Sequence, residues 1–324
     1  MEKLLITAAI GGVVSAVLGL LLLPLLRALK AGQSVRDIGP TWHNSKAGTP
    51  LMGGLMFIGG TVICLLVNLI SLTEYTVFYV LALSLCFGLV GFLDDFCKVK
   101  FKRDLGLTAV QKALLQMAVS ALYLYLLYKE GSLTCNLYIP FVNVNFYIHP
   151  LVYIFFAMFV MVGCVNAVNL TDGVDGLCGS VTIPVMVFFA AAAFALGRTD
   201  LALLPACLVG GLIAYLFFNW HPAKVFMGDT GSLFLGGVVC AMAFALDMPL
   251  ILILVGFVYI VETLSDIIQV AYFKATHGKR IFKMAPIHHH FEMCGWKEVK
   301  IVLVFTAVSA IACLIAWFGI SGRI

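Results

Sequence analysis

Residues 76–103 read TVFYVLALSLCFGLVGFLDDFCKVKFKR, and this stretch decides the class of fold. The run Thr76–Leu93 contains no charged residue and is long enough to cross the hydrocarbon core of a bilayer as a helix. Asp94 and Asp95 follow it at once, and a basic stretch comes next. The pattern predicts a transmembrane helix that carries two carboxylates at its end.

The rest of the chain is equally apolar. Of its 324 residues 62% are hydrophobic and 11% are charged, and the mean hydropathy is +1.07. Globular proteins are about 45–50% apolar and about a quarter charged, so a lipid bilayer is the expected surroundings. No linker-like composition divides the chain. We therefore predict an all-α, polytopic integral membrane protein that forms one domain over residues 1–324.

Ten transmembrane helices are expected, because each apolar run approaches the roughly 20 residues that a span needs. They cover Leu4–Leu26, Leu51–Leu72, Thr76–Leu93, Ala109–Tyr128, Leu151–Asn166, Leu177–Leu196, Leu201–Asn219, Ser232–Leu246, Leu250–Phe273 and Val299–Ile320. The first run is longer than a signal-peptide core, so we expect it to stay as a span. Repeated Gly-Gly pairs suit close helix contacts in lipid, such as Gly53-Gly54, Gly59-Gly60, Gly210-Gly211 and Gly236-Gly237.

The ten cysteines form no C-x-x-C pair, and most lie in or beside apolar runs, so we interpret them as small hydrophobic residues. The net charge of +4 is too small to indicate a nucleic-acid partner. Basic residues are unevenly placed, with 16 of the 20 at one set of helix ends. By the positive-inside rule that side is cytoplasmic and both termini are extracytoplasmic. Residues 130–150, on the outer side, alternate polar and apolar residues and predict a small hairpin.

Most acidic residues gather at the cytoplasmic helix ends, where a carboxylate is costly and usually functional. Asp94 and Asp95 point about 100° apart on a helix, so they are expected to have different partners. Lys98 lies four residues after Asp94, on the same face. A carboxylate with an ammonium at a pocket rim suits binding of phosphate together with its divalent cation.

A second motif reads NAVNLTDGVDG over residues 166–176. Its polar residues recur at every third position and predict one polar side at a helix end; they are Asn166, Asn169, Asp172 and Asp175. Gly173 and Gly176 then allow the backbone to turn and approach a ligand. An ordinary glycine C-cap explains the glycines but not four polar residues in register.

A third motif reads NWHPAKVFMGDTGS over residues 219–232 and leads into the eighth span. Its turn presents backbone N–H groups at a helix N-terminus, which favours an anion. Asp229 would repel a bare phosphate, and this conflict disappears if Asp229 holds Mg²⁺. Phe226 is placed either to stack on a base or simply to pack in the core.

Two further features lie near the C-terminus. Glu262, Asp266 and Gln269 form one polar stripe on the ninth span, which predicts that this stripe faces protein or a water-filled cleft. The last loop reads MAPIHHHFE over residues 284–292. Its three consecutive histidines point in different directions, so hydrogen bonding to diphosphate or sugar is a more natural use than a shared metal.

On these motifs the chain resembles the polyprenyl-phosphate N-acetylhexosamine-1-phosphate transferases, over its whole length. The loop over 284–292 is similar to that of the muramoyl-pentapeptide branch. The resemblance implies transfer from UDP-N-acetylmuramoyl-pentapeptide to undecaprenyl phosphate, giving lipid I and UMP with Mg²⁺ as cofactor. It also implies a homodimer in the bacterial cytoplasmic membrane, a bent ninth helix and a site at the cytoplasmic face.

The resemblance also implies roles for individual residues. Catalytic roles fall to Asp94, Asp95, Asp229 and His289, and metal binding falls to Asp229 with Asn169 and Asp172 in support. Substrate binding falls to Lys46, Lys98, Lys112, Asn166, Asn169, Asp172, Asp175, Asn219, Phe226, Gly228, Gln269, His288 and His290. Within this set, Asp94 deprotonates or orients the lipid phosphate, the lysines neutralise diphosphate, and the uridine pocket involves Asp175, Asn219, Phe226 and Gln269.

Two alternatives stay open. A related transferase that uses UDP-N-acetylglucosamine would share the carboxylates and lysines but differ in the last loop. A cation-coupled transporter would also bury carboxylates, but it predicts inverted repeats and polar residues at mid-membrane. No such repeat is found, and the polar residues gather at one face, which disfavours a transporter. The sequence leaves open which carboxylate is the general base and whether a covalent aspartyl-phosphate forms.

Overall fold

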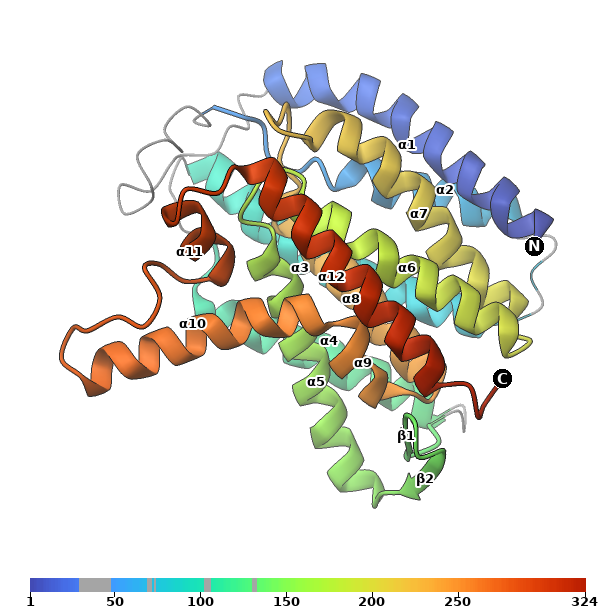
Figure 1. The fold of residues 1–324 in the computed structure, drawn as a ribbon. Coiled ribbons are helices and arrows are strands. Elements are labelled where there is room, and N and C mark those ends of the chain that lie inside the picture. The colour runs from blue at the N-terminus through green and yellow to red at the C-terminus, as the bar shows by residue number, and fades with distance from the viewer. Residues whose placement is uncertain (29–47, 69–71, 73, 102–105, 130–132) are drawn as a thin grey trace.

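The computed structural model describes residues 1–28, 48–68, 72, 74–101, 106–129 and 133–324 (Figure 1). Its helices are α1 (Glu2–Ala28), α2 (Leu55–Asn68), α3 (Thr76–Phe101), α4 (Ala109–Lys129), α5 (Pro150–Thr171), α6 (Leu177–Ala195), α7 (Thr199–Asn219), α8 (Gly228–Ala245), the 3-10 helix η3 (Pro249–Ile251), α9 (Leu252–Val255), α10 (Phe257–Ala275), α11 (Ile287–Met293) and α12 (Glu298–Gly319). The strands are β1 (Asn136–Ile139) and β2 (Val144–Tyr147).

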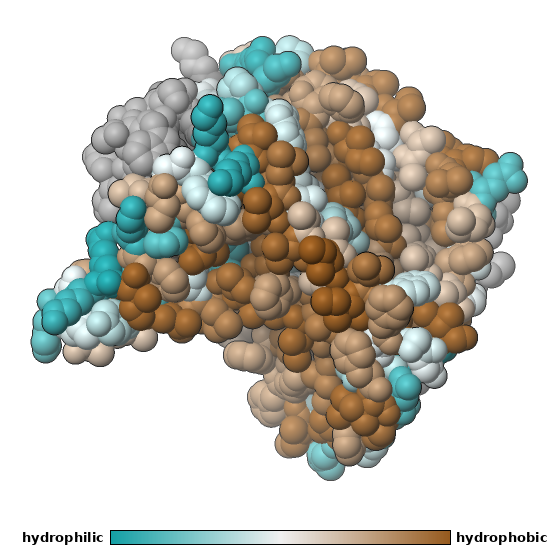
Figure 2. All heavy atoms as spheres, in the orientation of Figure 1, coloured by the Kyte–Doolittle hydropathy of each residue, from teal (hydrophilic) through white to brown (hydrophobic). Residues whose placement is uncertain are grey.

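The expectation of an all-α polytopic membrane protein is confirmed. In the part of the chain that the structure describes, eight helices are long and apolar enough to cross a membrane, and the bent pair around Gly256 makes up to nine. Hydrophobic side chains cover the middle of the visible face (Figure 2). The second expected span, Leu51–Leu72, is helical only over α2, and residues 69–71 lie outside the described residues.

The ninth expected span, Leu250–Phe273, is divided into two helical parts. The chain breaks at Gly256, and α10 turns away from η3 and α9 by 81°. Glycine is a weak helix former, and a Cβ at Gly256 would lie 2.6 Å from the Leu252 carbonyl oxygen. The bend that the family resemblance implies is therefore present, and α10 protrudes from the helix bundle (Figure 1).

Helix α8 forms the centre of the bundle, with 83% of its span buried, and packs against α3, α5 and α6. Its residues Gly236 and Gly237 permit this packing. A Cβ at Gly236 would lie 2.6 Å from the Val165 Cα on α5, and one at Gly237 would lie 2.9 Å from the Ser84 Cα on α3. The prediction that glycine pairs mark close helix contacts is confirmed, since each of the four pairs named above lies against a neighbouring segment.

The two ends of the bundle differ. The C-terminus lies near the β hairpin and the N-terminus on the same, right-hand side of the view, whereas α11 lies on the left (Figure 1). The predicted hairpin is confirmed: β1 and β2 pair antiparallel, with Asn136 opposite Tyr147. The Tyr138 hydroxyl donates a hydrogen bond to the Gly319 carbonyl at 3.1 Å, which ties the hairpin to the end of α12. All ten cysteines are free.

Candidate active site

Six polar side chains meet where α3, α4, α5 and α8 converge, and we call this group the carboxylate–lysine cluster. It consists of Asp94, Asp95, Lys98, Lys112, Asn169 and Asp229. The helix contacts that bring it together are those of α8 with α3 and α5, and of α4 with both. Residues far apart in the sequence therefore form one site.

Lys98 lies between the three carboxylates of the cluster. Its Nζ is 2.6 Å from an Asp94 oxygen, 3.6 Å from an Asp95 oxygen and 3.2 Å from an Asp229 oxygen. The prediction that Lys98 and Asp94 share a helix face is confirmed. An ammonium group at this position keeps three carboxylates together that would otherwise repel one another.

Asp229 is held from two further sides. Lys112 on α4 places its Nζ 2.8 Å from Asp229 Oδ2, and the Asn169 amide on α5 donates to Asp229 Oδ1 at 2.9 Å. The same amide donates to the Ser232 hydroxyl at 2.8 Å. Asp229 keeps 17% of its side chain exposed, whereas Asp94 keeps 4% and Asp95 none. Asp229 is thus the carboxylate of the three that a ligand reaches most easily.

The Asp95 carboxylate bonds the first residues of α8. Its Oδ2 accepts hydrogen bonds from the Thr230 backbone N–H at 2.9 Å and the Thr230 hydroxyl at 2.7 Å, and its Oδ1 accepts from the Asp229 N–H at 3.2 Å. A carboxylate at a helix N-terminus accepts hydrogen bonds from N–H groups that have no partner within the helix. Its negative charge also interacts favourably with the positive end of the helix dipole. Gly228 has φ +72°, and a Cβ there would lie 2.4 Å from Asp95 Oδ2, so this contact requires glycine.

The three carboxylates are arranged so that they could hold a metal ion. One oxygen from each of Asp94, Asp95 and Asp229 lies within 4.8 Å of the others. Carboxylate oxygens are the hard donors that Mg²⁺ prefers, alongside phosphate oxygens and water. Asn169 adjoins this group through Asp229. Asp172, at the C-cap of α5, belongs to neither of the two groups of side chains with metal-ligand spacing in the described part of the chain.

Asn166, a further residue of the expected site, contacts α4 and not the cluster. Asn166 exchanges hydrogen bonds with Gln116 of α4, at 2.7 and 3.3 Å, so its amide joins two helices below the cluster. Lys46 lies outside the described residues, and its expected role stays a prediction.

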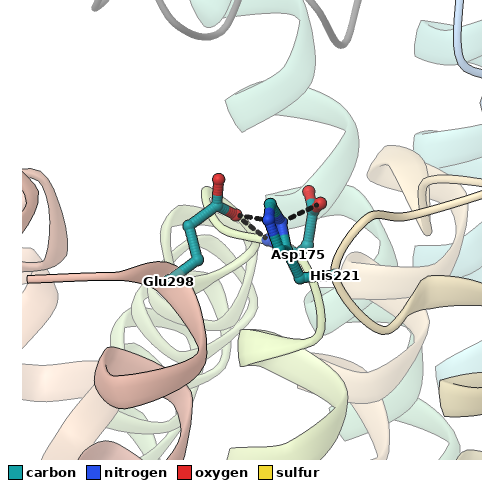
Figure 3. A group of neighbouring side chains, drawn as sticks. All are labelled: Asp175, His221 and Glu298. Atoms are coloured by element: carbon teal, nitrogen blue, oxygen red, sulfur yellow. Dashed lines mark hydrogen bonds and ion pairs between the residues drawn. The ribbon is translucent and has the colours of Figure 1, made fainter.

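A second polar group lies beside a cleft of about 510 Å³, which the Trp296 side chain also lines. Asp175, His221 and Glu298 come from three separate segments and point toward one another (Figure 3). His221 Nδ1 lies 3.1 Å from Asp175 Oδ2 and 3.5 Å from Glu298 Oε2. The Ala223 N–H also donates to Asp175 at 3.0 Å, so this group fastens the α7–α8 loop to the turn after α5 and to α12.

Of the four expected uridine-pocket residues, Asp175 lines this cleft, whereas Asn219, Phe226 and Gln269 do not. Asn219 is buried, accepts from the Gly176 N–H at 3.0 Å and donates to the Val225 carbonyl at 2.9 Å. Phe226 is half-buried against the core. Gln269 accepts from the N–H groups of residues 281 and 282 and donates to the carbonyl of residue 282, so its amide holds the segment that leads to α11.

The three histidines lie on α11, where each ring has a different protein partner. His288 is buried, with Nδ1 2.9 Å from Glu262 on α10. His289 Nδ1 lies 2.6 Å from Glu292 one turn later, and His290 Nδ1 accepts from the Lys283 N–H at 3.1 Å. The polar stripe predicted on the ninth span is in part explained, because Glu262 and Gln269 are both buried against the C-terminal segment.

Several residues of the site could not be predicted from the sequence. Thr230 and His221 stand within the third motif, but nothing there reveals that they bond Asp95 and Asp175. Gln116 on α4 and Glu298 at the start of α12 give no local signal at all. Each of these contacts joins residues at least 46 positions apart, and only tertiary packing brings them together.

Comparison with known proteins identifies the class first. The sequence model of glycosyl transferase family 4 matches residues 77–247, which include Asp94, Asp95, Lys98, Lys112, Asn169 and Asp229. The chain is thus a membrane-embedded transferase of this family, and the six residues of the carboxylate–lysine cluster lie within the matched part.

Full-length relatives narrow the class. The chain is 48% identical over 317 residues to the phospho-N-acetylmuramoyl-pentapeptide-transferase of Clostridium perfringens strain 13, covering 97% of this chain and 98% of the relative. It is 45% identical over 327 residues to the Clostridioides difficile strain 630 protein of the same name, covering 98% and 97%. The chain belongs to the phospho-N-acetylmuramoyl-pentapeptide transferase family.

Proposed function

We propose that this chain transfers phospho-N-acetylmuramoyl-pentapeptide from its UDP ester to undecaprenyl phosphate, forming lipid I and releasing UMP. The observation that carries the proposal is the carboxylate–lysine cluster, present in a chain that matches transferases of that name over nearly its whole length. Phosphoryl transfer asks mainly for positioning and charge neutralisation, which are what this cluster supplies.

The ammonium groups of Lys98 and Lys112 neutralise the phosphates of the two substrates. Both are partly exposed, at 24% and 16%, and both contact Asp229. Asp94 receives the proton of the lipid phosphate or orients that phosphate for attack on the donor. Asp95 does not contact substrate in this scheme. It fixes α8 and thereby the direction of Asp229.

Mg²⁺ is the proposed cofactor, held by Asp229 with the other two carboxylates of the cluster. The donor set fits, because it offers three hard oxygen ligands and carries one more negative charge than the two lysines balance. When bound, the ion supplies charge neutralisation to the diphosphate. Asn169 supports Asp229 through its amide.

The nucleotide sugar approaches from the end of the bundle that carries α11. Phe226, Asp175 and Asn219 border the uridine site, and His289 and His290 contact the diphosphate or sugar. The chain acts as one domain and as a homodimer in the bacterial cytoplasmic membrane, with α11 cytoplasmic and both termini outside. The support for this orientation is that 16 of the 20 basic residues lie on one side. Reaction of a Lys100→Cys variant with an impermeant reagent added outside intact cells would contradict this orientation.

The deciding experiment follows radiolabelled transfer to undecaprenyl phosphate by purified protein, with each UDP-sugar as donor and with UMP release measured in parallel. We expect Mg²⁺-dependent transfer from UDP-N-acetylmuramoyl-pentapeptide and poor use of UDP-N-acetylglucosamine. Efficient transfer of N-acetylglucosamine-1-phosphate would assign the chain to the related transferases instead.

A further inference from the structure

Glu262 and His288 form a buried pair that the proposed reaction does not yet use. Glu262 lies on α10 with no exposed surface, and His288 on α11 is 1% exposed. Glu262 Oε2 lies 2.9 Å from His288 Nδ1 and 3.5 Å from the His288 backbone nitrogen. The other polar atom of each side chain, Oε1 and Nε2, is buried without a hydrogen-bond partner. Buried polar groups are nearly always paired, so these two call for an explanation.

The partner of Nδ1 fixes the orientation of the His288 ring. Because a carboxylate accepts from Nδ1–H, Nε2 faces the opposite side of the ring. That side lies against Gly173. A Cβ on Gly173 would lie 2.2 Å from Nε2 and 2.6 Å from Cε1, with no backbone atom as close. The ring therefore occupies the space that a side chain at residue 173 would need.

Gly173 belongs to the turn that ends α5. It follows Asp172, the C-cap residue of α5, and the Asp172 N–H donates to the Asn169 carbonyl at 3.2 Å. The Asn169 side chain in turn donates to Asp229 at 2.9 Å. A continuous set of contacts thus runs from Glu262 through His288 and the end of α5 to the carboxylate that is most open to ligand.

We propose that Glu262 is a positioning residue for the transfer reaction: it holds the His288 ring against Gly173 and so sets the end of α5, with Asn169, relative to Asp229. The proposal rests on the function proposed above. It explains why a carboxylate is buried inside α10, and why the residue after Asp172 has no side chain. If the pair only attached α11 to α10, its loss would affect folding but not the reaction at the cluster.

The test compares purified full-length variants for kcat, for KM of the donor and for the Mg²⁺ concentration that gives half the maximal rate, alongside Tm. Glu262→Gln keeps an oxygen that accepts from His288 Nδ1 but removes the charge. We expect kcat to fall about 10- to 100-fold, the range for changing an outer residue that orients a metal ligand, here Asp229, and the Mg²⁺ requirement to rise. Donor KM should stay within about twofold and Tm close to the wild type.

Gly173→Ala tests the contact itself. We expect about a tenfold loss of kcat in the wild-type background and little further loss in a His288→Ala background, where the ring is gone; such coupling marks residues in contact. Gly163→Ala, on the same helix with open space around it, is the matched control and should leave kcat unchanged.

Three results would overturn the proposal. They are Glu262→Gln with wild-type kcat and Mg²⁺ dependence, Gly173→Ala with the same loss of kcat in both backgrounds, and a fall in kcat that only follows a fall in folded protein. All variants are assayed with whichever UDP-sugar the wild type uses, so a wrong donor assignment and a wrong role for Glu262 give different results.

Discussion

The carboxylate–lysine cluster and α11 are both polar regions at helix ends, yet they are built differently. In the cluster, side chains from four helices bond one another directly, with Lys98 and Asp229 each touching several partners. On α11, three neighbouring histidines each bond a different residue, and His288 alone is fully buried. Removing one member of the cluster therefore exposes the others to unbalanced charge, whereas removing His289 or His290 affects one contact.

From this contrast we expect the cluster to serve the phosphate chemistry, and α11 to serve recognition of the donor sugar. The cluster offers charges that act on any diphosphate and cannot distinguish one amino sugar from another. In the proposed reaction, the α11 side chains and the residues of the cleft beside Glu298 and Trp296 are the groups that reach past the diphosphate. We expect substitutions in the first region to reduce turnover with every donor, and those in the second to change the choice of donor.

The largest effect is expected at Asp229. Asp229→Asn should lower kcat by about 10²-fold or more, the scale for removing one transition-state electrostatic group, and should weaken Mg²⁺ dependence. Asp94→Asn should behave likewise, whereas Asp247→Asn, at the opposite end beside Thr134, should be nearly silent. UMP release under saturating substrates is the measurement. Wild-type turnover and Mg²⁺ dependence in Asp229→Asn would show that the cluster is not the metal site.

Lys112 provides the next test. Lys112→Met removes an ammonium that lies 2.8 Å from Asp229, and we expect kcat/KM for the nucleotide donor to fall by about 10- to 10²-fold. Lys129→Met, at the other end of the same helix, is the matched control. An equal loss in both variants would indicate damage to α4 rather than loss of charge at the site.

A variant at His289 tests whether α11 determines the choice of donor. His289→Ala should reduce kcat/KM for UDP-N-acetylmuramoyl-pentapeptide by about tenfold, which corresponds to one hydrogen bond to a charged group. Tm should be retained, because α11 is a short segment at the edge of the bundle. His149→Ala, at the hairpin end, serves as control. If His289→Ala lowered the small activity with UDP-N-acetylglucosamine by the same factor, α11 would belong to the shared chemistry.

The smallest effect on turnover is expected at Thr230, whose hydroxyl bonds Asp95 at 2.7 Å. Thr230→Val should lower the free energy of unfolding by about 1.5–3 kcal/mol, the range for a hydrogen bond to a charged group, while the backbone N–H keeps its own bond to Asp95. Unfolding in detergent measures this. Thr306→Val removes a buried hydroxyl oxygen that has no partner, so it should cost nothing. Equal stability of the two variants would argue against Asp95 as the residue that fixes α8.

The sequence by itself determined the membrane class of the fold, most of its helices and the residues around which a site forms. An apolar run of span length has no other stable surroundings than lipid, and Lys98 meets Asp94 because residues four apart share a helix face. These are local rules, so they hold before the helices pack. The glycine pairs belong here too, since a missing side chain permits close approach whichever helix is the neighbour.

Only the tertiary structure decided which helices pack against one another. It turned Asp95 toward Thr230, 135 residues away, buried Glu262 against His288, and joined His221 to Asp175 and Glu298. It also bent the ninth span at Gly256. The physical reason is that a hydrogen bond between two helices depends on their mutual rotation and depth. Packing of all the helices together sets these, whereas the periodicity of any one of them fixes only which of its side chains share a face.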